Sequence, residues 1–265
     1  MYRVPKNTIS NFIKEVCQEI YNPLQEFMKV PQTEEEWKEI QNNFYCRWNF
    51  PNRCRVLDVK HIIIRNAPHS GSEYFNYKGT FTIILFASVD ENYSFRYNDV
   101  STKGRTSDAA VFSNSSLNAA LQANLLNFPK NGVFVADDAF PLKTFILEPY
   151  GRTTCLSRKQ KNFNYRLFRA RRIVENAFGI LASRLRIFEK SIPLAIDKVD
   201  ILVKTACALH NWLRTTSSEK YTEMGALDVE DFNAARIIPG SWRSEIHEAN
   251  GLQALRNNVG ARNYT

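Results

Sequence analysis

The chain has 265 residues, of which 44% are hydrophobic and 12% aromatic, so it can build one large core, which excludes wholesale disorder. Its formal net charge is +8. Its five cysteines form no Cys-x-x-Cys pair, which argues against a zinc ribbon or disulfide frame and favours reduced thiols in an intracellular compartment. The sequence has no apolar run of about 18 residues, so we expect no membrane span.

The first fifty residues predict two helices. Thr33 and Glu36 form a capping box that opens the second helix, which we expect to end near Trp48, before Pro51. The first helix covers residues 8–29 and places apolar side chains on one stripe at three-and-four spacing. That stripe comprises Ile9, Phe12, Ile13, Val16, Ile20 and Leu24.

The middle of the chain carries strand signals. Residues 54–65 are rich in branched side chains, and residues 80–90 form an apolar run typical of a strand that is buried on both faces. Residues 92–101 alternate and would form a hairpin with that run. A helix over residues 115–126 and a short strand within residues 131–140 follow. This order predicts an α/β fold in which helices flank a mixed sheet.

A long basic helix is predicted over residues 160–188. Residues 158–186 hold nine cations against the single acid Glu175, a difference that equals the net charge of the whole chain. Such a patch attracts polyanions and favours nucleic acid, although a basic stretch is often only a solvated face. The helix would bury the stripe Leu167, Ala170, Val174, Ala177, Leu181 and Leu185.

One more helix is predicted over residues 195–214, and little periodicity follows it. We therefore divide the chain into residues 1–50, a helical region; residues 51–215, the α/β domain; and residues 216–265, a loosely structured tail.

Four acids lie in predicted strands and helices from which they could bind the divalent metal ions of phosphodiester chemistry. Two divalent ions held by carboxylates can stabilise the attacking and the leaving oxygen, and Mg²⁺ prefers carboxylate ligands. Asp58 lies inside an apolar strand, Asp137 and Asp138 end a later strand, and Glu175 is on the basic helix. Either of the two adjacent aspartates could be the ligand.

Each of these acids also has a purely structural interpretation. Asp58 could form a buried ion pair with Lys60 or with an arginine. One of the two adjacent aspartates could cap a helix that starts near Phe140. Glu175 could pair along its own helix with Arg171 or Arg172.

Several motifs in order resemble the DDE-type transposase domain of the PIF/Harbinger superfamily and the host nucleases derived from it. The resemblance implies an RNase H-like fold and a triad of Asp58, Asp137 and Glu175 that binds two divalent ions, Mg²⁺ or Mn²⁺. Asp108 and Asp138 would be auxiliary. The matching stretches are LDVKHIII (57–64), residues 70–112, VFVADDAFPL (133–142), residues 163–188 and ALHNWLR (208–214).

The same resemblance implies a DNA endonuclease, in which water or a 3′-hydroxyl attacks a phosphodiester. It also implies a nuclear, and in part cytoplasmic, location and a Myb-like DNA-binding partner. We expect no membrane partner, because the sequence lacks an apolar run long enough to span a membrane. The oligomeric state is left open. Phosphates of double-stranded DNA would be held by Arg166, Arg169, Arg171 and Arg172.

The sequence departs from the family pattern at two points. The glycines that commonly flank the first aspartate are replaced by Arg55 and Val59. The branched Val59 side chain would crowd the metal approach, and Arg55 would pair with Asp58 or contact DNA. In addition, residues 1–50 resemble only part of a helix-turn-helix, although a plain packing helix is the alternative for residues 8–29. These departures favour a second hypothesis, a catalytically inactive descendant that acts as a DNA- or chromatin-binding interaction protein.

Overall fold

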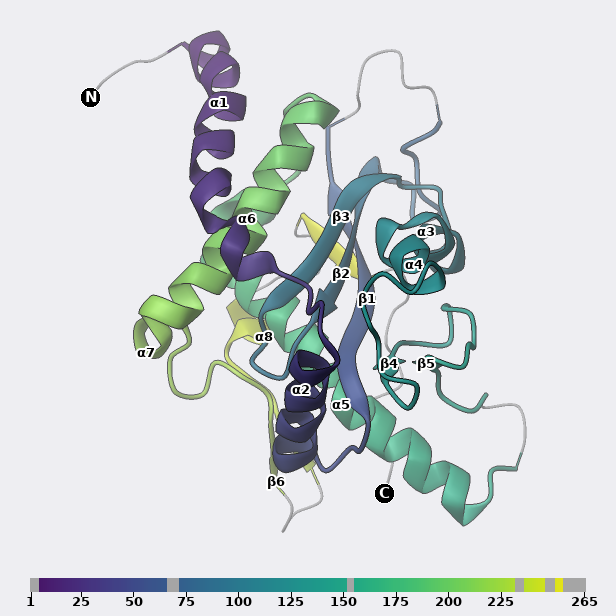
Figure 1. The fold of residues 1–265 in the computed structure, drawn as a ribbon. Coiled ribbons are helices and arrows are strands. Elements are labelled where there is room, and N and C mark those ends of the chain that lie inside the picture. Colours follow the sequence, from purple (N-terminus) through teal and green to yellow (C-terminus); the bar gives the residue numbers. More distant parts are fainter. Residues whose placement is uncertain (1–4, 66–71, 152–154, 232–235, 246–250, 255–265) are drawn as a thin grey trace.

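The computed structural model describes residues 5–65, 72–151, 155–231, 236–245 and 251–254. One mixed sheet forms its centre, with helices on both faces (Figure 1), which confirms the predicted α/β class and agrees with an RNase H-like fold. The strands of this sheet are β1 (Arg53–Ile63), β2 (Thr82–Val89), β3 (Phe95–Lys103), β4 (Val133–Val135), β5 (Ile146–Leu147) and β8 (Leu252–Ala254).

The sheet order is β3-β2-β1-β4-β5, with β8 alongside the second half of β1. The first three strands are antiparallel neighbours, whereas β4 and β5 run parallel to β1. Every residue of β2 is buried, as its uninterrupted apolar run predicts. Strand β1 lies at the centre of the sheet, with β2 on one edge and β4 on the other.

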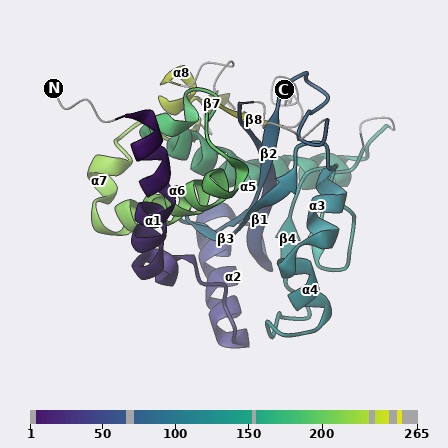
Figure 2. The ribbon, with the colours of Figure 1, turned by 90° about the horizontal axis from the view of Figure 1, so that it is seen from above.

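The helices form two layers on opposite faces of the sheet (Figure 2). One layer holds α5 (Arg158–Arg184) and α6 (Ile196–Thr216), and the other holds α3 (Asp108–Asn114) and α4 (Ser116–Gln122). A separate apolar cluster fills the space under each layer. The remaining helical segments are α1 (Lys6–Leu24), η1 (Gln25–Met28), α2 (Glu34–Trp48), η2 (Arg186–Phe188), α7 (Ser218–Tyr221) and α8 (Trp242–Glu245).

Successive side chains of β1 point alternately to the two layers, as the period of a strand requires. Val56 and Ile62 belong to the cluster beneath α5 and α6, whereas Leu57 and Val59 belong to the cluster beneath α3 and α4. Asp58 has the same parity as Val56 and therefore faces α5. This alternation decides which residues of β1 can take part in a site with the basic helix.

Helix α5 begins at a capping box made by Ser157 and Gln160. Five residues of its predicted stripe are buried, and Leu185 follows the last helical residue and is half-buried. Since this apolar stripe fixes the rotation of the helix about its axis, it also determines which of the charged residues face the sheet.

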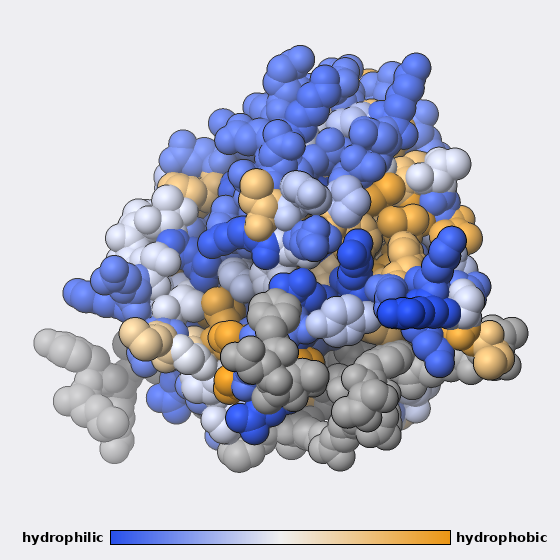
Figure 3. All heavy atoms as spheres, turned by 90° about the horizontal axis from the view of Figure 1, so that it is seen from below, coloured by the Kyte–Doolittle hydropathy of each residue, from blue (hydrophilic) through white to orange (hydrophobic). Residues whose placement is uncertain are grey.

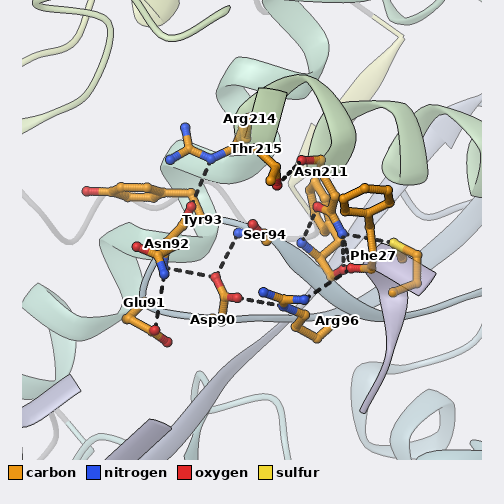
Figure 4. A network of polar contacts seen from close by, with 12 residues as sticks. Phe27, Asp90, Glu91, Asn92, Tyr93, Ser94, Arg96, Asn211, Arg214 and Thr215 are labelled. Atoms are coloured by element: carbon orange, nitrogen blue, oxygen red, sulfur yellow. Dashed lines mark hydrogen bonds and ion pairs between the residues drawn. The ribbon is translucent and has the colours of Figure 1, made fainter. Parts of the chain in front are cut away.

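A polar network ties the turn between β2 and β3 to α6 (Figure 4). Asp90 accepts the backbone N–H groups of Asn92 and Ser94, and its second oxygen lies 2.6 Å from Arg96 Nε. The Asn211 side chain accepts from the Phe95 N–H at 2.8 Å and donates to the Phe95 carbonyl at 2.5 Å. The ALHNWLR motif, which is part of α6, therefore fixes this helix to the sheet.

The neighbouring His210 is fully buried and has a structural role as well. Its Nε2 lies 2.9 Å from the Tyr93 carbonyl and must donate to it, so Nδ1 accepts from the Tyr221 hydroxyl at 3.0 Å. Burial lowers the pKa of His210 to about 3, and the ring is therefore neutral at physiological pH.

Helix α1 packs against α6. The Thr205 hydroxyl donates to the Cys17 carbonyl at 3.0 Å, and the Lys198 ammonium donates to the Ser10 carbonyl at 2.7 Å. The outward face of α1 leaves Phe12 and Val16 about half exposed.

The capping box predicted for α2 is present, because the Thr33 hydroxyl accepts from the Glu36 N–H and the Glu36 side chain accepts from the Thr33 N–H.

The region after α6, for which the sequence indicates little structure, contains ordered elements in its described parts. Helix α7 is followed by the hairpin of β6 (Val229–Asp231) and β7 (Arg236–Ile238), and then by α8 and β8. Strand β8 joins the sheet beside Lys60, His61 and Ile62 of β1. The pairing of β8 connects residues 252–254 to the centre of the fold.

The lower end of the molecule carries α2, β6 and the start of α5 (Figure 1), and hydrophilic residues cover most of it outside the residues drawn in grey (Figure 3). Among the described residues, no helix has both the length and the apolar character needed to span a bilayer.

Candidate active site

The sheet register sets Asp58 beside Asp137. Val56 of β1 pairs with Val135 of the parallel strand β4, and each aspartate lies two residues further along its chain. Because the two strands run in the same direction, both carboxylates lie at the same level of the sheet, in neighbouring segments. Asp137 follows the end of β4, where ligands collect in open α/β sheets, whereas Asp58 lies inside β1.

Asp58 is buried and has two cationic neighbours. The Lys60 ammonium lies 2.7 Å from its Oδ2, and a guanidinium nitrogen of Arg171 lies 4.0 Å from its Oδ1. Lys60 is itself held over the Phe178 ring of α5, at 5.3 Å from the ring centre. The structural interpretation of Asp58, a buried ion pair with Lys60 or an arginine, therefore has both partners in place.

Asp137 faces the same guanidinium group. Its Oδ2 lies 3.4 Å from the Arg171 nitrogen that approaches Asp58, and its Oδ1 accepts the Ala139 N–H at 3.0 Å. Burial raises the pKa of Asp137; the Arg171 charge opposes this rise and the Asp58 charge adds to it. The segment after Asp137 is a turn in the structure, so no helix near Phe140 needs a cap.

Arg171 is the centre of the acid cluster. It is buried, and desolvation alone would lower its pKa, but the charges of the surrounding acids raise the pKa above its ordinary value. In order of influence, these acids are Asp58, Asp137, Glu175 and Asp138. Four carboxylates from β1, from the end of β4 and from α5 thus act on one guanidinium group.

Glu175 stands one helical turn after Arg171, on the same face of α5. Its Oε2 forms an ion pair at 3.5 Å with Arg243 of α8, a residue that the sequence did not single out. Its side chain is more exposed than that of Asp58, at 21% against 5%. Glu175 therefore lies at the solvent-facing side of the cluster.

Two further acids act on the charges of this cluster, and the predicted auxiliary residue Asp108 belongs to α3. Asp138 follows Asp137 and acts on the charge of Arg171. Glu148, which sequence reasoning missed, follows β5; burial raises its pKa, and the charges of Asp138 and Asp137 raise it further. Its position directly after a parallel strand could have revealed it. Asp108 opens α3, whose apolar side chains pack on the other face of the sheet.

The four arginines proposed to bind DNA lie in different environments. Arg166 is exposed, and Arg171 is buried among the acids. Arg169 and Arg172 both point to Glu230 of β6, at 2.6 Å and 3.3 Å. Of this set, Arg166 alone has an exposed side chain.

Val59 and Arg55 do not obstruct the acids. Val59 packs in the cluster beneath α3 and α4, so its methyl groups point away from Asp58. Arg55 is buried with its guanidinium 5.4 Å from the centre of the Trp37 ring, in the same cluster. Burial lowers its pKa to about 10, and the charges of Asp90 and Glu91 oppose this. The expectations that Val59 crowds the site and that Arg55 pairs with Asp58 are wrong, because both side chains face the other layer.

Comparison with known protein families supplies the assignment. A family model described as DDE superfamily endonuclease matches residues 57–211, more than half of the chain, and includes Asp58, Asp137 and Glu175. The chain belongs to this family. Comparisons with curated proteins and with solved structures each gave no match. As a DDE superfamily endonuclease, the protein has a nuclease domain with DNA as its substrate class.

DDE endonucleases typically use divalent metal ions, and the ligand types of this site suit them, since carboxylate oxygens are what Mg²⁺ and Mn²⁺ prefer. In the described part of the chain, however, no three His, Cys, Asp or Glu side chains are grouped to hold one metal ion. The Arg171 guanidinium lies between Asp58 and Asp137 instead. A metal ion shared by these two acids would require Arg171 to withdraw.

Proposed function

We propose that this DDE superfamily endonuclease is a Harbinger-type, metal-dependent DNA nuclease in which Asp58, Asp137 and Glu175 are the triad. The observation that carries the proposal is that these acids come from three separate elements and act on one buried guanidinium, that of Arg171. Carboxylates are costly to bury, so their gathering beside a basic helix needs a reason beyond packing.

Each acid is held in place by a different structural element. Asp58 is fixed by the central strand, Asp137 by its strand end and by the Ala139 N–H, and Glu175 by the helix. Mg²⁺ or Mn²⁺ bound by these carboxylates would activate the attacking oxygen and neutralise the leaving one. Arg171 keeps the acids together before the ion binds, since its positive charge offsets their mutual repulsion.

DNA would approach along α5. The exposed Arg166 offers a phosphate contact, and a cationic helix attracts the duplex with a strength that falls as salt rises. We further propose a nuclear location, where the chain meets DNA, and a Myb-like DNA-binding partner. Sequence-specific targeting would come from that partner, because the arginines of α5 contact phosphates and carry no base information.

Nicking of supercoiled plasmid with Mg²⁺ or Mn²⁺ tests the proposal. The wild-type chain should nick, Asp137→Asn should not, and both should bind the plasmid. Asp197→Asn is a matched control, because it removes one carboxylate of α6 from an exposed ion pair with Lys14 of α1. Equal nicking by wild type and Asp137→Asn, or loss of nicking in Asp197→Asn as well, would refute the assignment of the triad.

A second function, DNA or chromatin binding without catalysis, is favoured by one observation. Each proposed triad residue is held by a cation of the protein itself, which is Lys60 for Asp58, Arg171 for Asp137 and Arg243 for Glu175. If the wild-type protein binds plasmid but does not nick it with either metal ion, this second function replaces the first.

A further inference from the structure

The chain after the family match covers part of α5. We define the carboxy-terminal cover as residues 228–231 and 236–245, which include β6, β7 and α8. These residues lie beyond the matched region, which ends at 211. The cover contacts α5 at three places, and each involves a residue beside the candidate site or on the basic face.

The first contact occupies the basic face of α5. Glu230 approaches Arg169 Nε at 2.6 Å and Arg172 at 3.3 Å, and it also accepts a hydrogen bond from the Tyr165 hydroxyl. Spacings of four and three place these partners on one helix face. The Glu230 side chain is 13% exposed. An anion thus sits where two arginines and a hydroxyl converge, an arrangement that equally suits a phosphate.

The second contact reaches the triad. Arg243 is held by the fully buried carboxylate of Asp228, with nitrogens at 2.9 Å from Oδ1 and 2.5 Å from Oδ2. From this anchor the same guanidinium extends to Glu175, at 3.5 Å. A cation supplied by the cover therefore pairs with the most exposed of the three proposed triad acids.

The third contact fixes the cover to the helix between these points. The Trp242 indole N–H donates to Asn176 Oδ1 at 2.8 Å, and the Asp228 N–H donates to the same oxygen at 3.1 Å. The indole ring lies directly on Gly179, where any side-chain carbon would collide with it. Asn176 and Gly179 follow Glu175 by one and four residues, so the cover docks immediately beside the site.

We propose that the cover is an autoinhibitory element, in which Glu230 takes the place of a DNA phosphate on Arg169 and Arg172 while Arg243 neutralises Glu175. The inference rests on the proposed function, because it assumes that α5 is the DNA-binding face. DNA binding would then require the cover to leave α5, exchanging one carboxylate for backbone phosphates. Affinity for DNA is reduced in proportion to the fraction of molecules that are open.

Removal of the Glu230 charge tests the first step. Glu230→Gln should bind a 20-base-pair duplex roughly five- to thirtyfold more tightly than wild type, because two arginines lose their internal partner. The slope of log affinity against log salt should stay nearly the same, since Arg169 and Arg172 contact phosphates in both bound complexes. Fluorescence anisotropy measures both quantities.

Asp231→Asn is the matched control. Asp231 is the next residue of β6, and its removal changes the net charge equally, but its ion pair is with the exposed Arg236 of β7, at 3.5 Å. If Glu230→Gln and Asp231→Asn change the affinity by the same amount, net charge explains the gain and the autoinhibition proposal fails.

Hydrogen exchange on the wild-type chain tests the proposal without any substitution. On addition of the duplex, amides of residues 228–231 and 236–245 should exchange faster, while amides in the first half of α5 should become protected. Unchanged or slower exchange in the cover while DNA is bound would overturn the proposal, as would failure of both wild type and Glu230→Gln to bind DNA at low salt.

The two proposals can fail separately. Absence of nicking by wild type and Glu230→Gln, combined with the predicted differences in affinity, would reject the nuclease and keep the cover. Triad-dependent nicking, with equal affinities for Glu230→Gln and Asp231→Asn, would reject the cover and keep the nuclease.

Discussion

The substitution Gly179→Ala measures how firmly the carboxy-terminal cover is attached to α5. A Cβ at this position would lie 2.2 Å from Cδ2 and 2.4 Å from Cε3 of the Trp242 ring. These distances are more than 1 Å shorter than an ordinary carbon contact, roughly 3.5–4.0 Å. The indole ring must therefore leave its place, and its hydrogen bond to Asn176 is lost with it.

Two effects of opposite sign decide the magnitude. Alanine in a helix interior is about 1 kcal/mol more favourable than glycine. Displacing a packed side chain costs roughly 1–3 kcal/mol, and losing the indole hydrogen bond costs about 1 kcal/mol more. We therefore expect Gly179→Ala to lower the free energy of unfolding by about 1–3 kcal/mol, against the usual effect of this change in a helix.

Urea unfolding, followed by circular dichroism, gives this free energy for a double-mutant cycle. In a Trp242→Ala background the collision is absent, so Gly179→Ala should raise the free energy of unfolding by up to about 1 kcal/mol. The sign of the effect should thus reverse between the two backgrounds. Stabilisation by Gly179→Ala in the wild-type background would show that Trp242 does not rest on this helix.

Three more changes have definite outcomes. Glu175→Gln should abolish metal-dependent nicking and leave DNA binding equal or stronger; equal nicking in the plasmid assay would refute its ligand role. Arg171→Met should destabilise the chain by about 3–5 kcal/mol and lower its melting temperature, because two buried carboxylates lose their shared cation. Added Mn²⁺ should restore part of the lost melting temperature. A melting temperature equal to that of wild type in the absence of metal would contradict the account. Finally, His210 has a folded pKa of about 3, below its unfolded value, so the stability due to the neutral ring is lost as pH falls below about 6.5. Between about pH 7.5 and pH 5.5 this loss is roughly 1.3 kcal/mol, which His210→Gln should remove from the pH dependence of urea unfolding.

Much of the fold was predictable from local patterns. The buried run of β2, the capping box of α2 and the apolar stripe of α5 each depend on neighbouring residues only, and each is confirmed. The alternation of side chains along β1 could also have been predicted from the residue numbers. Val59 and Arg55 are odd-numbered whereas Asp58 is even-numbered, so a strand must send them to opposite faces.

The environment of the site was harder to predict, because it depends on contacts between distant segments. Arg243 and Glu230 lie 68 and 58 residues away in sequence from the Glu175 and Arg172 side chains that they contact. They belong to elements of three or four residues, too short to give a periodic signal. The sequence therefore predicts a cationic face on α5, whereas the structure shows that Glu230 holds two of its arginines.

The most direct test of the shared acid site is a crystal structure of the chain with Mn²⁺, in which anomalous scattering locates the ion. We predict a peak bound by Asp58, Asp137 and Glu175, with the Arg171 guanidinium displaced from between the two aspartates. A peak elsewhere, or none with Arg171 still within 3.4 Å of Asp137, would contradict the proposal that these acids form a metal-dependent nuclease site.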